Sequence, residues 1–277
     1  MFVTIDIGGT NTRLASSSDL ESLSKIEKFP TPKNPDELHD KIQDYLKNLS
    51  GIKGVAVGVA GIIDRKLRTV VNAPHIPYLR DISVDRIVTL ESISPKIVLL
   101  ENDATLAALA EATKGQGKGF ENVAYITIST GVGGALITKE KIPKGRFNQE
   151  PGHHIINLDD PFEYKGNSRG TWESYCSGTA FKIRFKIDPA QVLDEKVWAD
   201  YGFVLAYGIN NIHLLWQPDV IILGGSLSKK WDLFSEMMFE TLNNLNKLPK
   251  PEIRQSTFGD ENGLIGGLEL MREKLLK

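Results

Sequence analysis

The chain has 277 residues, 41% of them hydrophobic and 25% charged, with a formal net charge of −2. This composition is ordinary for a globular protein, and the near balance of charge excludes an overall attraction to nucleic acid or to an anionic membrane. No apolar run is long enough to span a bilayer and no secretion signal opens the chain, and the single cysteine, Cys176, excludes an internal disulfide. We therefore expect a cytoplasmic enzyme of one large or two modest domains.

The chain begins with an apolar, β-branched run over residues 2–7, a glycine turn at Gly8-Gly9-Thr10, and a second apolar stretch from Leu14. This pattern predicts a β-hairpin. Its tip exposes backbone N–H and hydroxyl donors and lets an anion approach the main chain closely. The alternative is a plain turn whose glycines serve only the hairpin.

Strands and helices alternate through the next hundred residues. Apolar spacing predicts a helix over 35–49, and nearly continuous apolar runs predict buried strands over 54–61 and 96–100. The second of these strands ends at Glu101-Asn102-Asp103, and residues 104–113 are rich in helix formers. Glycines at 115, 117 and 119 then mark a candidate domain boundary.

A second glycine hairpin follows that boundary. Residues 123–128 and 135–137 flank the turn Ser129-Thr130-Gly131, so the hairpin at the start of the chain has a counterpart here. Beyond it the sequence predicts an irregular polar stretch over 148–169 and a long helix over 198–216. A strand over 219–223 that runs into Gly224-Gly225-Ser226 and a closing helix over 263–276 follow. Alternating strands and helices predict an α/β fold, and the repeated hairpin predicts two similar halves.

The first hairpin carries groups that suit a polyphosphate: glycine amides, the Thr10 hydroxyl, the Asn11 amide and the Arg13 guanidinium. Asp6, at the end of the first strand, would repel a phosphate unless a divalent cation lay between them. Magnesium held through water meets that need.

Asn102 and Asp103 lie at the end of a strand and the start of a helix, where ligands collect in open α/β sheets. A carboxylate there can accept a proton from an attacking hydroxyl, as phosphoryl transfer requires. The alternative is that one of the two residues is only a helix N-cap. We also expect the helix dipole to lower the pKa of Asp103.

The segment Glu150-Pro151-Gly152-His153 and, further on, Glu173 supply carboxylates and an imidazole, which together can hold vicinal sugar hydroxyls. The alternative is a solvated loop with incidental charges. His153 and His154 with Cys176 do not make a four-ligand zinc site.

Taken together, these motifs resemble those of the ROK family (repressors, open reading frames and kinases) of the sugar-kinase, heat-shock-protein and actin superfamily. The matching stretches occur in family order and are Asp6–Asn11, Glu101–Ala104, Ser129–Gly134, Glu150–His153 and Gly224-Gly225.

The resemblance implies a two-domain actin-like ATPase fold, a duplicated ribonuclease H-like α/β fold with an interdomain cleft that holds the sugar. The expected domains are a small N-terminal α/β domain over 1–104, joined by the C-terminal helix 263–277, and a large C-terminal α/β domain over 105–262. It also implies that Asp103 accepts the proton of the sugar 6-hydroxyl.

The resemblance assigns the remaining site residues as well. The sugar would be held by Asn72, Asn102, Asp103, Glu150, His153 and Glu173. ATP would be bound by Gly8, Gly9, Thr10, Asn11, Thr12 and Arg13 with Thr130, Gly131 and Gly225, and Mg²⁺ by Asp6 and Asp103 through water.

One departure concerns zinc. Many family members carry a cluster of cysteines between the Glu-x-Gly-His stretch and the following glutamate, whereas residues 163–173 of this chain contain none. We therefore expect no structural zinc.

The prediction from sequence is an ATP- and Mg²⁺-dependent hexokinase of the glucokinase type that phosphorylates the 6-hydroxyl of glucose and related hexoses. Its expected partners are a hexose, ATP and a second copy in a homodimer, with no nucleic acid and no membrane. The alternatives are an N-acetylglucosamine or N-acetylmannosamine kinase, a sugar-responsive ROK-type transcriptional regulator that lacks its DNA-binding region, and an actin-like ATPase without a sugar.

Overall fold

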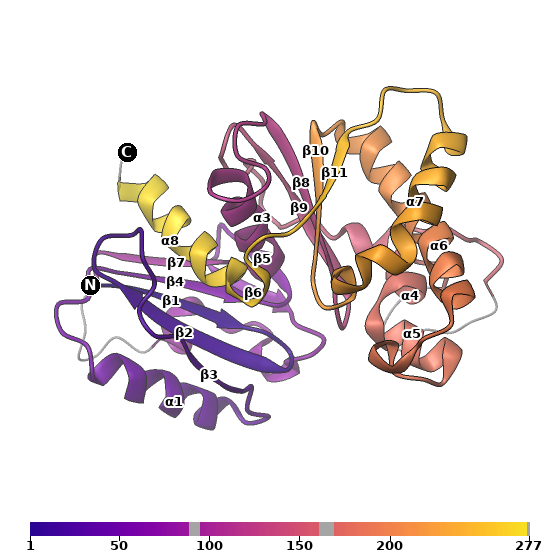
Figure 1. Cartoon of the computed structure of the whole chain (residues 1–277). Helices are drawn as coiled ribbons and strands as arrows, with labels where there is room; N and C mark the ends of the chain where they lie inside the picture. The colour runs from indigo at the N-terminus through magenta and orange to yellow at the C-terminus, as the bar shows by residue number, and fades with distance from the viewer. Residues whose placement is uncertain (89–94, 161–168, 276–277) are drawn as a thin grey trace. The chain divides into compact units, whose positions relative to one another are not determined.

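The computed structural model describes residues 1–88, 95–160 and 169–275. The chain divides into two compact units, each with its own sheet (Figure 1). Unit 1 comprises Met1–Thr113, Lys141–Asn148 and Asp260–Lys277, and unit 2 comprises Lys114–Glu140 and Gln149–Gly259. Within the described residues, no helix is both long and apolar enough to cross a membrane.

Unit 1 is built on a five-stranded sheet in the order β3-β2-β1-β4-β7. The strands are β1 (Phe2–Ile7), β2 (Asn11–Ser17), β3 (Glu27–Pro30), β4 (Gly54–Val59) and β7 (Ile97–Asn102). β1, β4 and β7 are parallel, with Asp6 paired to Gly58 and Gly58 to Glu101. The carboxyl ends of these three strands therefore meet at one edge of the sheet.

Helices cover both faces of this sheet (Figure 1). α1 (Pro35–Lys47) is capped by Asn34, whose side chain accepts a hydrogen bond from the backbone N–H of Asp36. It buries Leu38, Ile42 and Leu46 against the strands, because residues four apart share one face of a helix.

The opposite face is covered by α3 (Asp103–Thr113) and α8 (Asn262–Leu275), which pack closely on each other. At Gly266 a Cβ atom would lie 1.9 Å from the carbonyl oxygen of Leu106, so only glycine allows this approach. Leu268 and Met271 of α8 pack on Phe2 and Ala56 of the sheet.

Unit 1 also holds a short hairpin of β5 (Ile62–Asp64) and β6 (Thr69–Asn72), a four-residue helix α2 (Val84–Ile87), and the segment Lys141–Asn148. Arg146 donates to the Asp64 carboxylate at 2.9 Å, and the Asn148 side chain accepts from the backbone N–H of Ile63 at 2.7 Å. These contacts explain why 141–148 belongs to unit 1, although we expected it in a domain spanning 105–262.

Unit 2 contains a four-stranded sheet in the order β11-β10-β8-β9. Its strands are β8 (Asn122–Ile128), β9 (Val132–Thr138), β10 (Val220–Gly224) and β11 (Glu252–Gln255), and its helices are α4 (Trp172–Cys176), α5 (Gly178–Phe185), α6 (Glu195–Trp216) and α7 (Trp231–Leu245). α6 and α7 pack on each other (Figure 1). Phe181, Trp198, Tyr201 and Phe234 form an aromatic cluster in this core.

Both predicted glycine hairpins are confirmed: β1 pairs with β2 and β8 with β9 in antiparallel register. The pattern missed β3, the β5–β6 hairpin and β11, which have three or four residues each and offer too little periodicity to detect. The predicted closing helix is confirmed over Asn262–Leu275, and the expected residues beyond it, 276 and 277, lie outside the described residues.

Candidate functional site

Two carboxylates lie at the carboxyl edge of the unit 1 sheet. Asp6 is near the end of β1, and Asp103 begins α3 directly after β7. Gly58, on the strand between them, has no side chain, and a Cβ there would lie 2.9 Å from Leu106 and 3.7 Å from the Asp103 Cα. The pKa of Asp6 is raised to about 7, first by burial and then by the negative charge of Asp103, so the two carboxylates interact.

Asn102 caps α3. Its Oδ1 accepts the backbone N–H of Thr105 at 2.9 Å, and its Nδ2 donates to the carbonyl of Gly61 and to Asp103 Oδ1. Both Asn102 and Asp103 had been candidates for the cap, and Asn102 takes that role. Asp103 is left at the first helical turn with its Oδ1 held by Asn102 and by the backbone N–H of Ala104.

The expectation of a lowered Asp103 pKa is wrong. Desolvation raises the pKa of this carboxyl and outweighs the lowering by the Ala104 N–H and by the nearby His75. The helix terminus does act in the predicted direction, through that N–H, but removal of water from the carboxylate is the larger effect. A raised pKa makes Asp103 a better proton acceptor than the cap geometry alone suggests.

The first hairpin tip is stabilised from within. The Gly8 N–H donates to the Asn11 carbonyl at 3.0 Å, and the Thr31 hydroxyl donates to the Gly8 carbonyl at 2.7 Å. Thr12 is fully buried and its hydroxyl pairs with that of Thr31, so its placement favours support of the turn over direct contact with a nucleotide. Gly9 and Thr10 are the exposed part of the tip.

Arg13 is paired to Asp6 across the β1–β2 register. Its guanidinium lies 3.4 Å from the Asp6 carboxylate and donates to Asp260 at 2.8 Å. The Arg13 guanidinium is therefore shared by two carboxylates, those of Asp6 and Asp260. The sequence pattern did not indicate Asp260, which lies at the start of the C-terminal segment.

His75 is a second unpredicted neighbour. It follows β6 and is exposed, and a Cβ at Gly9 would lie 2.6 Å from the His75 side chain. His75 lies close enough to the Asp103 carboxyl to lower the pKa of that group. Asn72, the predicted sugar ligand, is exposed at the end of β6 and pairs with Ile62 through the sheet.

An ion pair supports the strand end that carries Asn102 and Asp103. Arg65 binds both oxygens of Glu101, at 2.6 and 3.0 Å, and the same carboxylate accepts the Asn102 N–H at 2.9 Å. Arg65 also donates to the Phe147 carbonyl at 2.9 Å. No sequence signal marks Arg65, because its partner is 36 residues away.

In unit 2, the second hairpin tip contacts Glu173. One oxygen of Glu173 accepts the backbone N–H of Val132 at 2.8 Å, and a Cβ at Gly131 would lie 2.6 Å from that oxygen. The Thr130 carbonyl accepts the hydroxyl of Thr179 at the start of α5. Gly131 is thus required for Glu173 to reach the tip.

Glu150 directly precedes a short 3₁₀ helix, Pro151–His153, and His153 is the last residue of that helix. A Cβ at Gly152 would lie 2.1 Å from the Val132 carbonyl, so this turn packs directly on β9 beside the hairpin tip. His153 Nδ1 lies 3.7 Å from the Glu150 carboxylate, and the His153 side chain is 42% exposed. The structure therefore brings Glu150, His153 and Glu173 to one region of unit 2.

The neighbouring His154 and Cys176 serve the core. His154 packs on Trp172 and its Nδ1 lies 2.5 Å from the Pro151 carbonyl, while Cys176 is fully buried. Residues 163–168 of the stretch that lacks the family's cysteines lie outside the described residues.

Gly225 also lies next to the second tip. It has φ of +89°, and a Cβ there would lie 2.4 Å from the carbonyl oxygen of Ile128, the last residue of β8. The following Ser226 hydroxyl lies 3.4 Å from that of Ser129. Gly225 therefore lies beside the turn that carries Thr130 and Gly131.

Two carboxylates of the described residues, Asp6 and Asp103, fit Mg²⁺ held through water. Among the described residues, no group of three or more His, Cys, Asp or Glu side chains could hold an ion. Mg²⁺ usually keeps several waters and takes one or two carboxylates plus substrate phosphates. Asp6 and Asp103 suit this role because a cation would relieve the repulsion between them.

The chain is similar to known proteins along almost its whole length. The sequence profile of the ROK family matches residues 2–274. The glucokinase of Streptomyces coelicolor is 28% identical over 97% of this chain and 96% of its own length. The N-acetyl-D-glucosamine kinase of Haemophilus influenzae is 26% identical over 99% of this chain and 100% of its own length.

Among solved structures, the ROK family glucokinase of Streptomyces griseus, determined with glucose and AMPPNP, superposes with a TM-score of 0.81. The superposition covers 98% of this chain and 99% of that one at 24% identity, which shows a shared fold. The predicted actin-like ATPase fold of the sugar kinases is thereby confirmed. With a profile match along almost its whole length, the chain belongs to the ROK family.

Proposed function

We propose that this protein transfers the γ-phosphoryl group of ATP to the 6-hydroxyl of glucose, with Asp103 as the base. The chain is an ATP-dependent sugar kinase, an activity in keeping with its family and with the glucokinase that matches it over 97% of its length. The observation that carries the proposal is the Asp103 carboxylate, oriented by hydrogen bonds and with a raised pKa, beside Asp6 at the carboxyl edge of a parallel sheet.

Asp103 is held for proton transfer through one oxygen. Asn102 Nδ2 and the Ala104 N–H fix Oδ1, and we assign Oδ2 to the sugar. As the sugar O6 forms its bond to the γ-phosphorus, the proton on O6 passes to Asp103 and the bond to ADP breaks. In a loose transition state this proton moves late, so orientation matters more than strong basicity.

We propose that the other sugar hydroxyls are held by Asn72, Glu150, His153 and Glu173. The support in unit 2 is that the 150–153 turn and Glu173 both pack at Val132 beside the second hairpin tip. In unit 1, Asn102 uses its side chain to cap α3, so its contribution is to orient Asp103.

For the nucleotide, we propose the exposed Gly9 and Thr10 with Asn11 and Arg13, together with Thr130, Gly131 and Gly225. Mg²⁺ supplies charge neutralisation of the phosphates when it is bound near Asp6 and Asp103. The Arg13 guanidinium partly offsets the effect of burial on Asp6, because it lowers the pKa that desolvation raises.

The specificity for glucose is the finer part of the proposal, because a kinase for N-acetyl-D-glucosamine also matches the whole chain. The two sugars differ at the 2-position. The test is ADP release, followed by coupled absorbance, with glucose, mannose, glucosamine and N-acetylglucosamine as acceptors, and 6-deoxyglucose as the control that lacks the reacting hydroxyl.

We expect glucose to give the highest kcat/KM and 6-deoxyglucose to give no sugar-dependent ADP release. A higher kcat/KM for N-acetylglucosamine than for glucose would make N-acetylglucosamine the preferred substrate and would leave the kinase assignment intact. ADP release that is the same with and without any sugar would contradict the sugar kinase assignment itself.

A further inference from the structure

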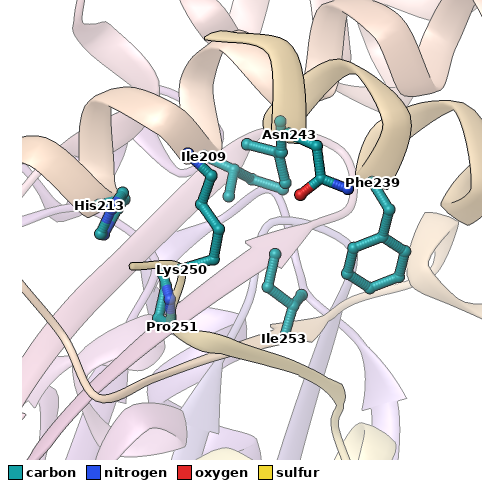
Figure 2. Close-up of a pocket in the computed structure, with 8 residues that line it drawn as sticks. Ile209, His213, Phe239, Asn243, Lys250, Pro251 and Ile253 are labelled. Carbon is teal, nitrogen blue, oxygen red and sulfur yellow. The ribbon is translucent and has the colours of Figure 1, made fainter. Parts of the chain in front are cut away.

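A small, partly open hollow lies in unit 2 between α6, α7 and the segment that leads into β11 (Figure 2). α6 contributes Ile209 and His213, α7 contributes Phe239 and Asn243, and the β11 segment contributes Lys250 and Ile253. None of these residues belongs to the proposed kinase site. The walls are mostly apolar, and the polar groups are few, as in sites for small organic ligands.

The imidazole of His213 is unpartnered in this hollow. The residue is only 6% exposed, and both Nδ1 and Nε2 are buried without a hydrogen-bond partner among the described residues. A buried polar group without a partner is destabilising, so it requires an explanation. A ligand that accepts or donates at this ring would provide one.

Lys250 supplies a positive charge to the same hollow. Its Nζ donates to the carbonyl of Asn246 at 2.9 Å and to the Asn246 side chain at 2.7 Å, which leaves one of its three hydrogens for another acceptor. Asn246 is anchored in turn to Asn210 of α6. The ammonium group is therefore fixed at the site and not free to turn away.

The charges that act on these two groups are cationic. The pKa of His213 is lowered by burial and by Lys250, and the pKa of Lys250 is lowered by burial and by Lys247. A bound anion would offset the effect of these positive charges on the two groups. A monocarboxylate fits better than a phosphate, because its two oxygens match one ammonium and one imidazole donor and its single charge is less costly to remove from water.

We propose that this hollow binds a small monocarboxylate with an alkyl or aryl body, whose carboxylate contacts Lys250 Nζ and a ring N–H of His213. The body of the ligand then lies against Ile209, Phe239 and Ile253. This site is independent of the kinase assignment, so either can fail alone.

The experiment titrates the full-length protein with acetate, hexanoate and benzoate, and with the neutral isosteres hexanamide and benzamide, by isothermal titration calorimetry up to about 10 mM. In parallel, ¹⁵N resonances of the His213 ring are followed by NMR. The variant Lys250→Met removes the charge and keeps the stem, and Lys247→Met is the matched control on the same segment. Melting temperatures establish that both variants are folded.

We expect hexanoate or benzoate to bind and to shift the His213 ring resonances, with the matching amide about tenfold weaker or more. Lys250→Met should weaken binding about tenfold, and Lys247→Met should leave it within about twofold. The proposal is overturned if no carboxylate binds, if the amides bind equally well, or if Lys250→Met binds as the wild type does. A hollow filled only by water would give the first of these results.

Discussion

At the scale of single residues, Arg65 belongs to no motif in the sequence, yet it makes several contacts in unit 1. It binds the buried Glu101, whose carboxylate also accepts the N–H of Asn102, and it reaches the 141–148 segment through the Phe147 carbonyl. It thus supports the strand end that presents Asp103.

We predict that Arg65→Met lowers the free energy of unfolding by roughly 3 kcal/mol, because it leaves the Glu101 charge buried and unpaired. Arg80→Met is the control, since Arg80 pairs with Asp81 at the surface, and it should cost about 0.5 kcal/mol or less. Urea unfolding of the two variants measures the difference. Equal losses of unfolding free energy in the two variants would show that the buried ion pair contributes no more to stability than the surface pair.

His154 gives a prediction about pH. Burial lowers its pKa below the ordinary 6.5, so the folded protein holds this imidazole neutral while the unfolded chain protonates it. Its contribution to stability is therefore present above pH 6.5 and is lost as pH falls towards the lowered value. Urea midpoints at about pH 7.5 and 5.5 should differ less in His154→Asn than in the wild type. Equal pH dependence in both proteins would contradict this account.

At the scale of elements, the glycine hairpins carry the argument, and the turns beside them are constrained by space as well as by φ. Gly225 and Gly119 have nearly the same φ, +89° and +91°, but only at Gly225 would a Cβ meet other atoms. They form a matched pair that separates backbone strain from steric exclusion.

We predict that Gly119→Ala costs about 1–2 kcal/mol from the unfavourable φ alone. Gly225→Ala should cost roughly 2 kcal/mol more, because its Cβ would lie 2.4 Å from the Ile128 carbonyl, and it should also weaken ATP binding. Chemical unfolding and nucleotide titration measure both effects. Equal destabilisation by the two substitutions would show that the β8 end yields to a methyl group.

The sequence predicted those elements whose signal is local and strong. The hairpins, the strand before Asp103 and the long helices have clear periodicity or glycine turns. Arg65, His75 and Asp260 could not be found in this way, because each reaches the site through tertiary contact with residues far along the chain. The Asp103 pKa was misjudged for the same reason: the helix terminus is visible in the sequence, but desolvation is not.

At the scale of the whole molecule, unit 1 is assembled from three separate segments of the chain. Its sheet depends on α8, which covers the face formed by Phe2 and Ala56 with Leu268 and Met271. The N-terminal segment therefore lacks part of its own core until the last residues of the chain are present.

We predict that a fragment of residues 1–113 alone unfolds or aggregates, and that joining residues 260–277 to it through a flexible linker restores cooperative thermal unfolding. Gly266→Leu in the joined fragment is the control, since its side chain would collide with the Leu106 backbone and prevent docking of α8. Circular dichroism melting curves distinguish these cases. A cooperative, monomeric 1–113 fragment would show that α8 is dispensable.

The proposed function depends on Asp103 as the proton acceptor for the sugar hydroxyl. The direct measurement is kcat for glucose phosphorylation by the variant Asp103→Asn, with the affinity for glucose measured separately by calorimetry. The amide keeps the shape of the side chain but accepts no proton. We predict that kcat falls by about 10²–10⁴ while the glucose Kd changes by less than about tenfold. Turnover near that of the wild type, with glucose still bound, would contradict the central claim.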